Sequence, residues 1–365
     1  MVKTAVVILN WNGSKHKLLR HYLPSVVRYT PEDLAEVVVA DNGSDDDSLQ
    51  LLAEYFPTVR VLPLGQNYGF AEGYNRVINA LSKEGVDYVV LLNDDVRVTE
   101  GWLEPMLAYM ENHRECAALQ PKLLKDWSFD EKNPGVWDSL NPAVERKVDS
   151  FEYAGACGGF LDNLCYPFCQ GRIFDSVEED HGQYDLPDGQ AYDVMWATGA
   201  CLLVRVDRYL TAGGLDARFF AHMEEIDLCW RLRRLGYSIG CLPQSVVFHK
   251  GGASLPQGNP RKTMLNFRNS LVMMWKNLPA EKRDKLIFRR KLLDGLAALN
   301  FLLNGQCGNF CAIWKAHREA SQMIKTQYKA SDLVGFGQAK EFPEESRSIL
   351  WDYYVRGRKT YYRSK

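Results

Sequence analysis

The first 120 residues alternate short apolar runs with amphipathic segments, and this alternation limits the possible folds more than any other feature. Residues 4–9 form a run rich in β-branched side chains, which is typical of a strand buried on both faces. Apolar side chains then recur at helical spacing over residues 18–26, where Pro24 should kink the helix. Further strands are expected at 36–40, 59–62 and 86–92, near 117–119 and at 195–204, and further helices at 48–56, 69–81, 102–113 and about 224–235. Strands that alternate with helices predict right-handed crossovers and a mostly parallel sheet, and therefore an α/β fold.

Residues 125–195 interrupt this alternation. They are rich in glycine, aspartate, proline and aromatic residues and show no clear element pattern. Stretches of this length without regular structure are usually functional, so we expect a substrate-binding loop region here. Its aromatic residues Tyr153, Phe160 and Tyr166 are candidates for stacking on sugar rings. Beyond Pro260 the pattern predicts helices almost to the end of the chain.

Composition limits the partners of the protein. With 46% hydrophobic and 25% charged residues, the chain is typical of globular proteins, and its net charge of −2 argues against nucleic-acid binding. The charge is uneven, because residues 282–365 carry a balance of +9 and residues 1–281 a balance of −11. A basic C-terminal segment could contact an anionic membrane surface, or it could simply be a solvated helical face.

Targeting signals are not recognisable in the sequence. The N-terminal residues lead directly into an expected strand, and nowhere do 18 consecutive apolar residues occur. The nine cysteines are scattered through apolar segments, which favours reduced thiols. We therefore expect a cytoplasmic protein, in peripheral contact with the inner face of the cytoplasmic membrane if the basic segment binds lipid.

Polar residues collect where four of the expected strands end. The four segments are Asn10-Trp11-Asn12-Gly13, Asp41-Asn42-Gly43-Ser44-Asp45, Asn67-Tyr68-Gly69-Phe70-Ala71 and Asn93-Asp94-Asp95. Ligands bind beyond the carboxyl ends of the strands in open α/β sheets, so the four together favour a nucleotide site over four structural turns. Adjacent carboxylates repel each other unless a cation neutralises them, and oxygen ligands suit Mg²⁺ or Mn²⁺. No G-x-G-x-x-G or P-loop motif follows the first strand, which excludes the common dinucleotide and P-loop sites.

A second acidic cluster, Glu224, Glu225 and Asp227, lies at the start of an expected helix. Acidic residues commonly stabilise helix N-termini, and Asp227 could pair with Arg231 one turn later. The cluster is interleaved with apolar residues, however, and such surroundings raise a carboxyl pKa towards that of a general base. Downstream, His249 ends another expected strand, and near Asp95 it would complete a metal site.

Taken in order, these motifs resemble those of family 2 glycosyltransferases, most closely the bacterial rhamnosyltransferase-type branch. The resemblance covers about residues 3–280 and rests on the four strand-end segments together with Ala197-Thr198-Gly199-Ala200 and Glu224-Glu225-Ile226-Asp227-Leu228. It implies a GT-A fold with a Rossmann-like sheet flanked by helices, a nucleotide-diphosphate sugar donor, a divalent cation, and inversion at the anomeric carbon.

The resemblance also implies roles for individual residues. Asp41 would bind the nucleoside, and Asn93-Asp94-Asp95 stands at the family's D-x-D position, with asparagine in place of the first aspartate. Asp95 and His249 would be the metal ligands. The base would be Glu225 or Asp227, with Glu224 beside it, and the choice between the two is open. The remaining donor-binding candidates are Asn10, Asn12, Asn67, Gly69, Asn93 and Asp94.

The expected function is therefore inverting hexosyl transfer from a dTDP- or UDP-sugar to a glycan or lipid-linked acceptor in bacterial surface polysaccharide synthesis. A sugar-nucleotide pyrophosphorylase is the first alternative, but it should carry a glycine-rich basic loop after the first strand. A non-catalytic sugar-nucleotide or glycan-binding module is the second, and the intact acidic cluster argues against it. We expect a GT-A domain over residues 1–280, followed by a basic helical extension (281–365). Within the domain we expect a nucleotide-sugar-binding half (1–120), an inserted loop region (125–195) and an acceptor and catalytic half (196–260).

Overall fold

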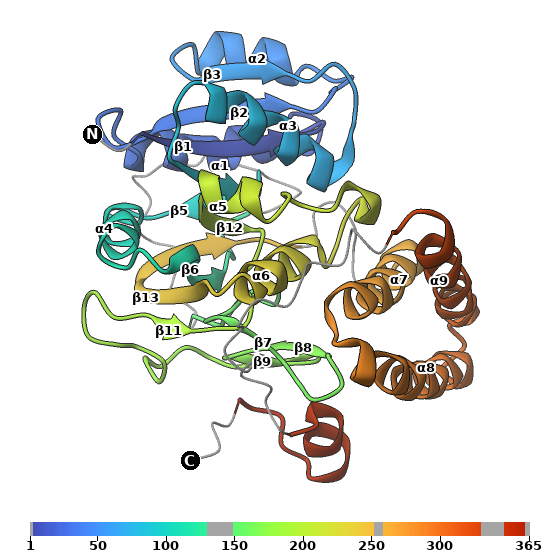
Figure 1. Cartoon of the computed structure of the whole chain (residues 1–365). Coiled ribbons are helices and arrows are strands. Elements are labelled where there is room, and N and C mark those ends of the chain that lie inside the picture. The colour runs from blue at the N-terminus through green and yellow to red at the C-terminus, as the bar shows by residue number, and fades with distance from the viewer. Residues whose placement is uncertain (1–2, 130–148, 252–257, 330–346, 362–365) are drawn as a thin grey trace.

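The computed structural model describes residues 3–129, 149–251, 258–329 and 347–361. Its centre is a nine-stranded sheet in the order β11-β13-β6-β12-β4-β1-β2-β3, with β5 pairing β13. The strands are β1 (Thr4–Asn10), β2 (Glu36–Asp41), β3 (Arg60–Pro63), β4 (Tyr88–Leu92), β5 (Val96–Val98), β6 (Cys116–Lys125), β11 (Tyr192–Asp193), β12 (Cys201–Arg205) and β13 (Ser238–His249). Figure 1 shows this sheet running through the molecule with helices on both sides. The predicted α/β architecture is confirmed.

The first four strands pair in parallel, and their register aligns the polar segments that follow them. Asn10 lies opposite Asp41, and Ile8 lies opposite Leu92, so Asn93 follows close to the end of β1. β12 runs antiparallel between β4 and β6. The carboxyl ends of β1, β2 and β4 therefore meet at one edge of the sheet.

Both faces of the sheet are buried, which explains the continuous apolar runs. Val7 on β1 packs into a cluster with Val77 and Ile78, whereas Val6 packs into another with Leu19 and Leu23. The helices of this half are α1 (Leu18–Tyr29, with Pro24 inside it), α2 (Ser48–Tyr55), α3 (Gly69–Lys83), α4 (Glu104–Asn112), α5 (Val206–Thr211) and α6 (Glu224–Arg234). Alternate residues of each strand thus serve opposite helical layers.

Two parts of the sequence prediction were wrong in extent. The strand expected near 117–119 spans all of β6, because nine of its ten residues pair with β13 and two of them also pair with β12. The strand expected at 195–204 shrinks to β12, because Trp196 makes only an isolated bridge with Gly159 and the following Thr198-Gly199 turn lines a cavity.

The region expected to be a loop contains a second sheet. Its antiparallel strands are β7 (Gly159–Leu161), β8 (Pro167–Cys169), β9 (Arg172–Ile173) and β10 (Ser176–Val177). Such two- and three-residue strands are too short to leave a period in the sequence. Residues 130–148 of the expected loop lie outside the described residues.

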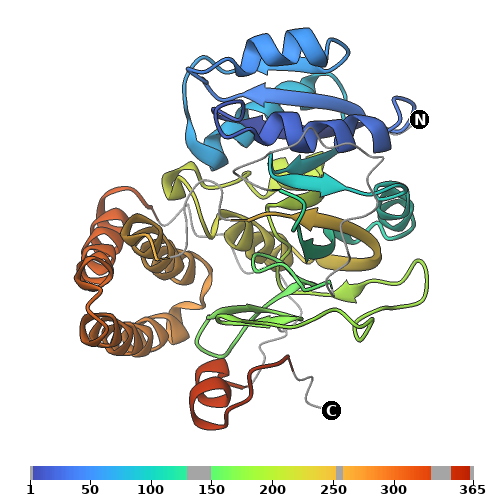
Figure 2. The same ribbon diagram turned by 180° about the vertical axis from the view of Figure 1, so that it is seen from behind.

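The C-terminal third is helical, as predicted, and lies to one side of the main sheet (Figures 1 and 2). It consists of α7 (Pro260–Asn277), α8 (Ala280–Leu303) and α9 (Cys307–Thr326). The later residues 347–361 return to the second sheet, where the Tyr353 hydroxyl lies 3.1 Å from Ser176 Oγ and Tyr361 N donates to Glu178. The chain end thus packs on the region that was expected to be a loop.

Candidate active site

A cavity of about 1420 Å³ opens at the carboxyl-end edge of the main sheet. Its walls come from the segments after β1, β2 and β4, the start of α3, the second sheet, the start of α6, and the helices α7 and α8. Four expected donor-binding residues line it, namely Asn67, Gly69, Asn93 and Asp94. So do the expected metal ligands Asp95 and His249 and the acidic residues Glu224 and Glu225.

Three expected donor-binding residues lie behind the cavity wall. Asn10 is fully buried and donates from Nδ2 to Asp41 Oδ1 over 3.0 Å, and the Ser44 hydroxyl donates to the same oxygen. Asn12 exchanges hydrogen bonds with Asp45, from Nδ2 to Oδ1 at 2.7 Å and from the Asp45 amide at 2.9 Å. These residues join the segments after β1 and β2, and the cavity is lined beside them by Trp11 and Asn42.

Trp11 and Asn42 were missed as site residues. Trp11 is 48% exposed at the cavity, which is unusual for a large aromatic side chain. Asn42 donates from Nδ2 to Asn67 Oδ1 and to the carbonyl of Gly69, each over 3.2 Å, and accepts from the amide of Tyr68. It thereby fixes the turn into α3. Asp41 and Asn42 are adjacent polar residues at the end of β2, and the sequence does not indicate which of them faces the cavity.

The backbone conformation and the close packing at position 69 require glycine. Its φ is +77°, and a Cβ atom there would lie 2.9 Å from the Phe220 ring and 3.1 Å from the Phe220 carbonyl oxygen. The amide of Phe70 donates to that same carbonyl over 3.2 Å. The start of α3 is therefore packed against the segment that leads into α6.

The paired carboxylates after β4 occupy different surroundings. Asp95 is 4% exposed, and its Oδ1 lies 2.9 Å from His249 Nε2. Burial would raise the pKa of Asp95, but the charge and hydrogen bond of His249 hold it below its usual range. Burial and, next, the charge of Asp95 raise the pKa of Asp94 to about 8. Near neutral pH, Asp95 is therefore ionised, whereas the carboxyl group of Asp94 is partly protonated because its neighbour is already charged.

The predicted proximity of Asp95 and His249 is confirmed, and a third residue joins them. His249 Nδ1 lies 3.2 Å from Glu152 Oε2, in the region expected to be a loop. Burial lowers the pKa of His249, but Asp95 and Glu152 together raise it well above its usual value. In the described part of the chain, no three His, Cys, Asp or Glu side chains are grouped so that they alone could hold a metal ion. Asp94 and Asp95 fit a cation whose remaining ligands are water and substrate phosphate.

The three acidic residues at the start of α6 differ in their access to the cavity. Glu224 and Glu225 line the cavity, whereas Asp227 is fully buried and does not. Burial raises the pKa of Glu225 to about 7. Burial and the neighbouring Glu225 raise the pKa of Glu224 well above its usual value. Glu225 is thus partly exposed to the cavity and would exchange a proton near neutral pH.

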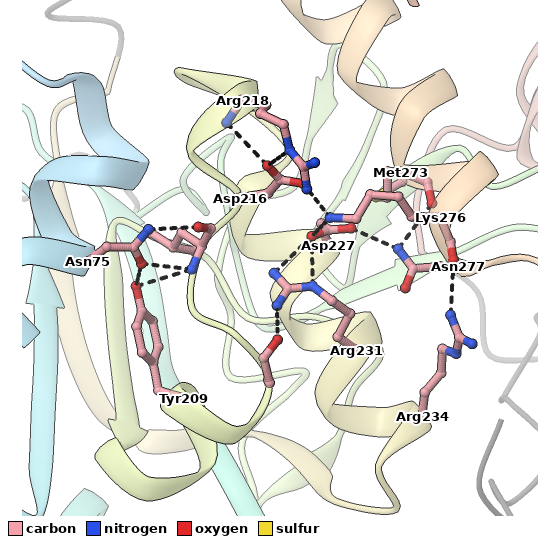
Figure 3. Close-up of polar contacts among 12 residues, drawn as sticks. Asn75, Tyr209, Asp216, Arg218, Asp227, Arg231, Arg234, Met273, Lys276 and Asn277 are labelled. Carbon is pink, nitrogen blue, oxygen red and sulfur yellow. Dashed lines mark hydrogen bonds and ion pairs between the residues drawn. The ribbon is translucent and has the colours of Figure 1, made fainter. Parts of the chain in front are cut away.

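Asp227 is held by polar contacts on both oxygens (Figure 3). Its Oδ2 accepts from Arg231 Nε over 2.9 Å and from Lys276 Nζ over 2.7 Å, and its Oδ1 accepts from Asn277 over 2.8 Å. Burial would raise the pKa of Asp227, but Arg231 and Lys276 hold it below its usual range. The carboxylate therefore stays ionised and joins α6 to α7, which disfavours it as a base.

The backbone before Glu224 is unusual. Phe220, His222 and Met223 have φ values of 67°, 70° and 72°, which non-glycine residues rarely adopt. Buried Asn269 on α7 donates from Nδ2 to three carbonyls of this segment, those of Phe219, Ala221 and His222, over 3.1, 2.8 and 2.8 Å. A single amide group thus holds the turn that positions the acidic cluster.

The end of the cavity beside the second sheet is aromatic and basic. Tyr153 and Tyr166 line it, as expected, together with Phe174 and Arg172. Phe160 does not line it, because it is 5% exposed and packs against Phe168 and Tyr361. The expected stacking role of Phe160 was therefore wrong.

The fold is that of GT-A glycosyltransferases. The structure aligns with a crystal structure of GalNAc-T7 with UDP, GalNAc and Mn²⁺ at a TM-score of 0.58 and 16% identity. The alignment covers 89% of this chain and 58% of that one, so this chain spans little more than half of that protein.

Sequence comparison finds a family model over part of the chain and several relatives. Residues 5–177 match the model of glycosyl transferase family 2. The N-acetylglucosaminyl-diphospho-decaprenol L-rhamnosyltransferase of Mycobacterium tuberculosis is 28% identical over 67% of this chain and 75% of its own length. The rhamnosyltransferase WbbL of Escherichia coli is 23% identical over 59% and 72%. The low-salt glycan biosynthesis hexosyltransferase Agl10 of Haloferax volcanii is 21% identical over 66% and 67%. Residues 5–177 thus carry a family 2 glycosyltransferase domain, and the chain is similar to rhamnosyltransferases.

Proposed function

We propose that this protein transfers a hexose from a nucleotide-diphosphate sugar to an acceptor hydroxyl, with inversion at the anomeric carbon. The observation that carries the proposal is that Glu225, whose pKa is raised to about 7, shares one cavity with the paired carboxylates Asp94 and Asp95. A base that titrates near neutral pH beside a site for a cation and phosphates is what such a transfer requires.

In the proposed reaction Glu225 takes the proton of the acceptor hydroxyl. The hydroxyl oxygen forms the new bond to the anomeric carbon while the bond from that carbon to the diphosphate oxygen breaks. The nucleoside diphosphate leaves with the electron pair. Glu224 stays protonated beside Glu225, because burial and the charge of Glu225 raise its pKa. Asp227 positions α6 through Arg231 and Lys276.

The donor is expected to lie along the edge formed by β1, β2 and β4. Asn42, Asn67 and the backbone at Gly69 line the nucleotide end, with Asn10, Asn12 and Asp41 holding the loops behind it. Asp95, with Asp94 beside it, would hold Mg²⁺ or Mn²⁺ together with the donor diphosphate. His249 would orient Asp95 or serve as a further ligand. The cation would supply charge stabilisation of the leaving diphosphate.

The relatives support a narrower choice of substrates. Two of them are named rhamnosyltransferases, so we propose a dTDP- or UDP-linked hexose as donor. The mycobacterial relative is named for a diphospho-decaprenol acceptor, so we propose a lipid-linked glycan of surface polysaccharide synthesis as acceptor. We assign residues 1–120 to the donor, 125–195 mainly to the acceptor and 196–260 to catalysis, with residues 281–365 as an extension of the 1–280 domain.

We also propose that α8 lies on the inner face of the cytoplasmic membrane. No helix of the described residues has the length and apolarity needed to cross a membrane. One face of α8 nevertheless exposes five large apolar side chains at intervals of three or four residues: Phe288 (64%), Leu292 (58%), Leu296 (64%), Leu299 (49%) and Leu303 (77%). The described part of the chain leaves this apolar ridge uncovered.

Basic residues beside the apolar ridge favour a lipid surface over a protein partner. Lys282, Lys285 and Arg289 are exposed at the N-terminal half of α8. An apolar stripe flanked by basic residues is typical of helices that lie in the interface of anionic membranes. Such contact would bring the cavity to a lipid-linked acceptor.

A donor panel tests the proposed reaction. The protein would be incubated with dTDP-, UDP- and GDP-sugars, Mg²⁺ or Mn²⁺, and a prenyl-diphosphate-linked N-acetylglucosamine acceptor. We expect one glycosylated product, with inverted anomeric configuration by NMR. Formation of a sugar nucleotide from a nucleoside triphosphate and a sugar 1-phosphate would instead indicate a pyrophosphorylase. Donor binding without turnover on any acceptor would indicate a binding module.

A further inference from the structure

Arg172, the first residue of β9, is a buried cation that the proposed reaction does not use. It lines the cavity and exposes only 6% of its surface. Among the described residues, its guanidinium group contacts a carbonyl, a thiol and an aromatic ring. No carboxylate is among them.

These contacts use little of the hydrogen-bonding capacity of the guanidinium group. Nη1 donates to the Phe174 carbonyl and Nη2 to Cys169 Sγ, each at 3.4 Å. Nε is buried and has no hydrogen-bond partner in the described structure. The guanidinium carbon lies 4.6 Å from the centre of the Tyr153 ring, so the group is fixed in orientation by stacking. Part of the hydrogen-bonding capacity of this guanidinium group therefore remains unused beside the cavity.

Two other buried arginines have a carboxylate partner, whereas Arg205 donates to the carbonyls of Cys116 and Met110 and does not line the cavity. Arg231 Nη2 lies 2.8 Å from Asp227, and Arg290 Nε lies 3.0 Å from Asp294. Arg290 also lines the cavity, but Asp294 neutralises it, and its guanidinium stacks on Tyr166. Burying a charge is costly unless an opposite charge accompanies it. Within the described residues, Arg172 thus lines the cavity without an ion-pair partner to offset its burial.

Two carboxylates that line the cavity, those of Glu152 and Asp175, have other surroundings. Glu152 faces His249 at 3.2 Å, and Asp175 is exposed to solvent. Neither forms an ion pair with Arg172 within the described residues. An anionic ligand entering the cavity would supply the missing charge.

The position of Arg172 points to the acceptor. It belongs to the second sheet, whereas the residues proposed for the donor follow β1, β2 and β4. We propose that Arg172 binds a phosphate group of the acceptor, so that the acceptor is a saccharide whose glycosylated sugar carries a phosphate or diphosphate. This inference rests on the proposed transferase function. A planar guanidinium can pair with two phosphate oxygens at once, and Tyr153 would hold it in that orientation.

The phosphate could come from a prenyl diphosphate or from a sugar phosphate without lipid. Three probes separate these sources: N-acetylglucosaminyl diphosphate on a short prenyl chain, N-acetylglucosamine 1-phosphate, and neutral octyl N-acetylglucosaminide. Binding would be measured by calorimetry without donor, so that the result does not depend on turnover. We expect the wild-type protein to bind the prenyl diphosphate probe at least about tenfold more tightly than the neutral probe. Equally tight binding of the soluble phosphate probe would assign recognition to phosphate itself, and weak binding of it would assign the source to a lipid-linked acceptor.

Arg172→Gln should abolish most of this preference, and Arg172→Lys should retain part of it. Arg208→Gln is the matched control, because Arg208 also stacks on a tyrosine at 4.6 Å but does not line the cavity. In turnover assays Arg172→Gln should raise the acceptor KM about ten- to hundredfold and leave the donor KM unchanged. Equal wild-type affinity for the charged and neutral probes would overturn the proposal even if Arg172→Gln fails to fold. A rise confined to the donor KM would also overturn it. A preserved phosphate preference without any sugar transfer would contradict the transferase function alone.

Discussion

At the scale of single residues, the surroundings of each carboxyl group separate roles that the sequence left together. Glu225 and Asp227 are two positions apart in one helical turn, yet one faces the cavity and the other is enclosed by Arg231, Lys276 and Asn277. Two ion pairs keep Asp227 ionised, so it cannot respond to pH near neutrality. Glu225 can.

We predict that Glu225→Gln binds donor almost normally but transfers sugar about 10²–10⁴-fold more slowly, the usual loss when a general base is removed. In the wild-type protein kcat/KM should rise with pH up to about 7 and then level off, because Glu225 must be deprotonated to act and its pKa is about 7. Steady-state kinetics from pH 5 to 9 provide the measurement. If Asp227→Asn gives this loss while folding normally, and Glu225→Gln stays active, the base is Asp227.

A second prediction at this scale concerns Asp95. Asp95→Ala should abolish metal-dependent donor binding in calorimetry, because Asp94 alone leaves one carboxylate for the cation. Circular dichroism and a melting curve would establish that the variant is folded. Full donor affinity in Asp95→Ala, or in wild-type protein with chelator, would contradict a role for the metal in binding.

At the scale of elements, the contact between α6 and α7 determines where the acidic cluster lies. Lys276 is 4% exposed and reaches both Asp216 and Asp227, each over 2.7 Å (Figure 3). Asn269, two turns earlier on α7, holds the carbonyls of the preceding turn. α7 therefore supports the proposed base, although β13 lies between α6 and α7 in the chain.

We predict that Lys276→Met lowers the free energy of unfolding by about 3–5 kcal/mol, because it leaves two buried carboxylates without their shared cation. Chemical denaturation would measure this, with Lys285→Met on the exposed face of α8 as the control. The pKa values of Asp216 and Asp227 are held below their usual range, so the wild-type network should contribute fully above pH about 4 and weaken only as pH falls further. A large fall in the free energy of unfolding of the wild-type protein between pH 8 and pH 5 would contradict this prediction.

At the scale of the whole molecule, the cavity is assembled from segments that are distant in the sequence. The donor edge comes from the first 100 residues, the proposed base from α6, and the acceptor end from the second sheet and α8. α8 contributes Arg290 to the cavity wall, while its apolar ridge faces outward. One helix thus connects the acceptor end with the proposed membrane surface.

We predict that the protein floats with vesicles containing about one-third anionic lipid at low salt and less at high salt, since each basic residue contributes about 1 kcal/mol before screening. Leu292→Ser combined with Leu296→Ser should weaken flotation without lowering the melting temperature, because both side chains are exposed. Leu49→Ser, which alters an exposed leucine on α2, is the control. Absence of wild-type flotation at low salt would exclude the lipid role, and dimers that the double variant abolishes would assign the apolar ridge to a second copy of the chain.

The sequence alone determined the α/β class, the positions of the first four strands and the resemblance to family 2 glycosyltransferases, because periodicity and turn chemistry are local. It also placed Asp95, His249, Glu224 and Glu225 at one site, since the carboxyl ends of strands share an edge. The tertiary structure decided what depends on contacts between distant residues. It buried Asp227 in an ion-pair network, placed Glu152 beside His249, and turned Trp11 and Asn42 rather than Asn10 and Asp41 towards the cavity. Among the residues that the structure describes, it also left Arg172 without a carboxylate partner. Burial and ion pairing depend on which segments of the chain pack together, and a short stretch of sequence does not contain that information.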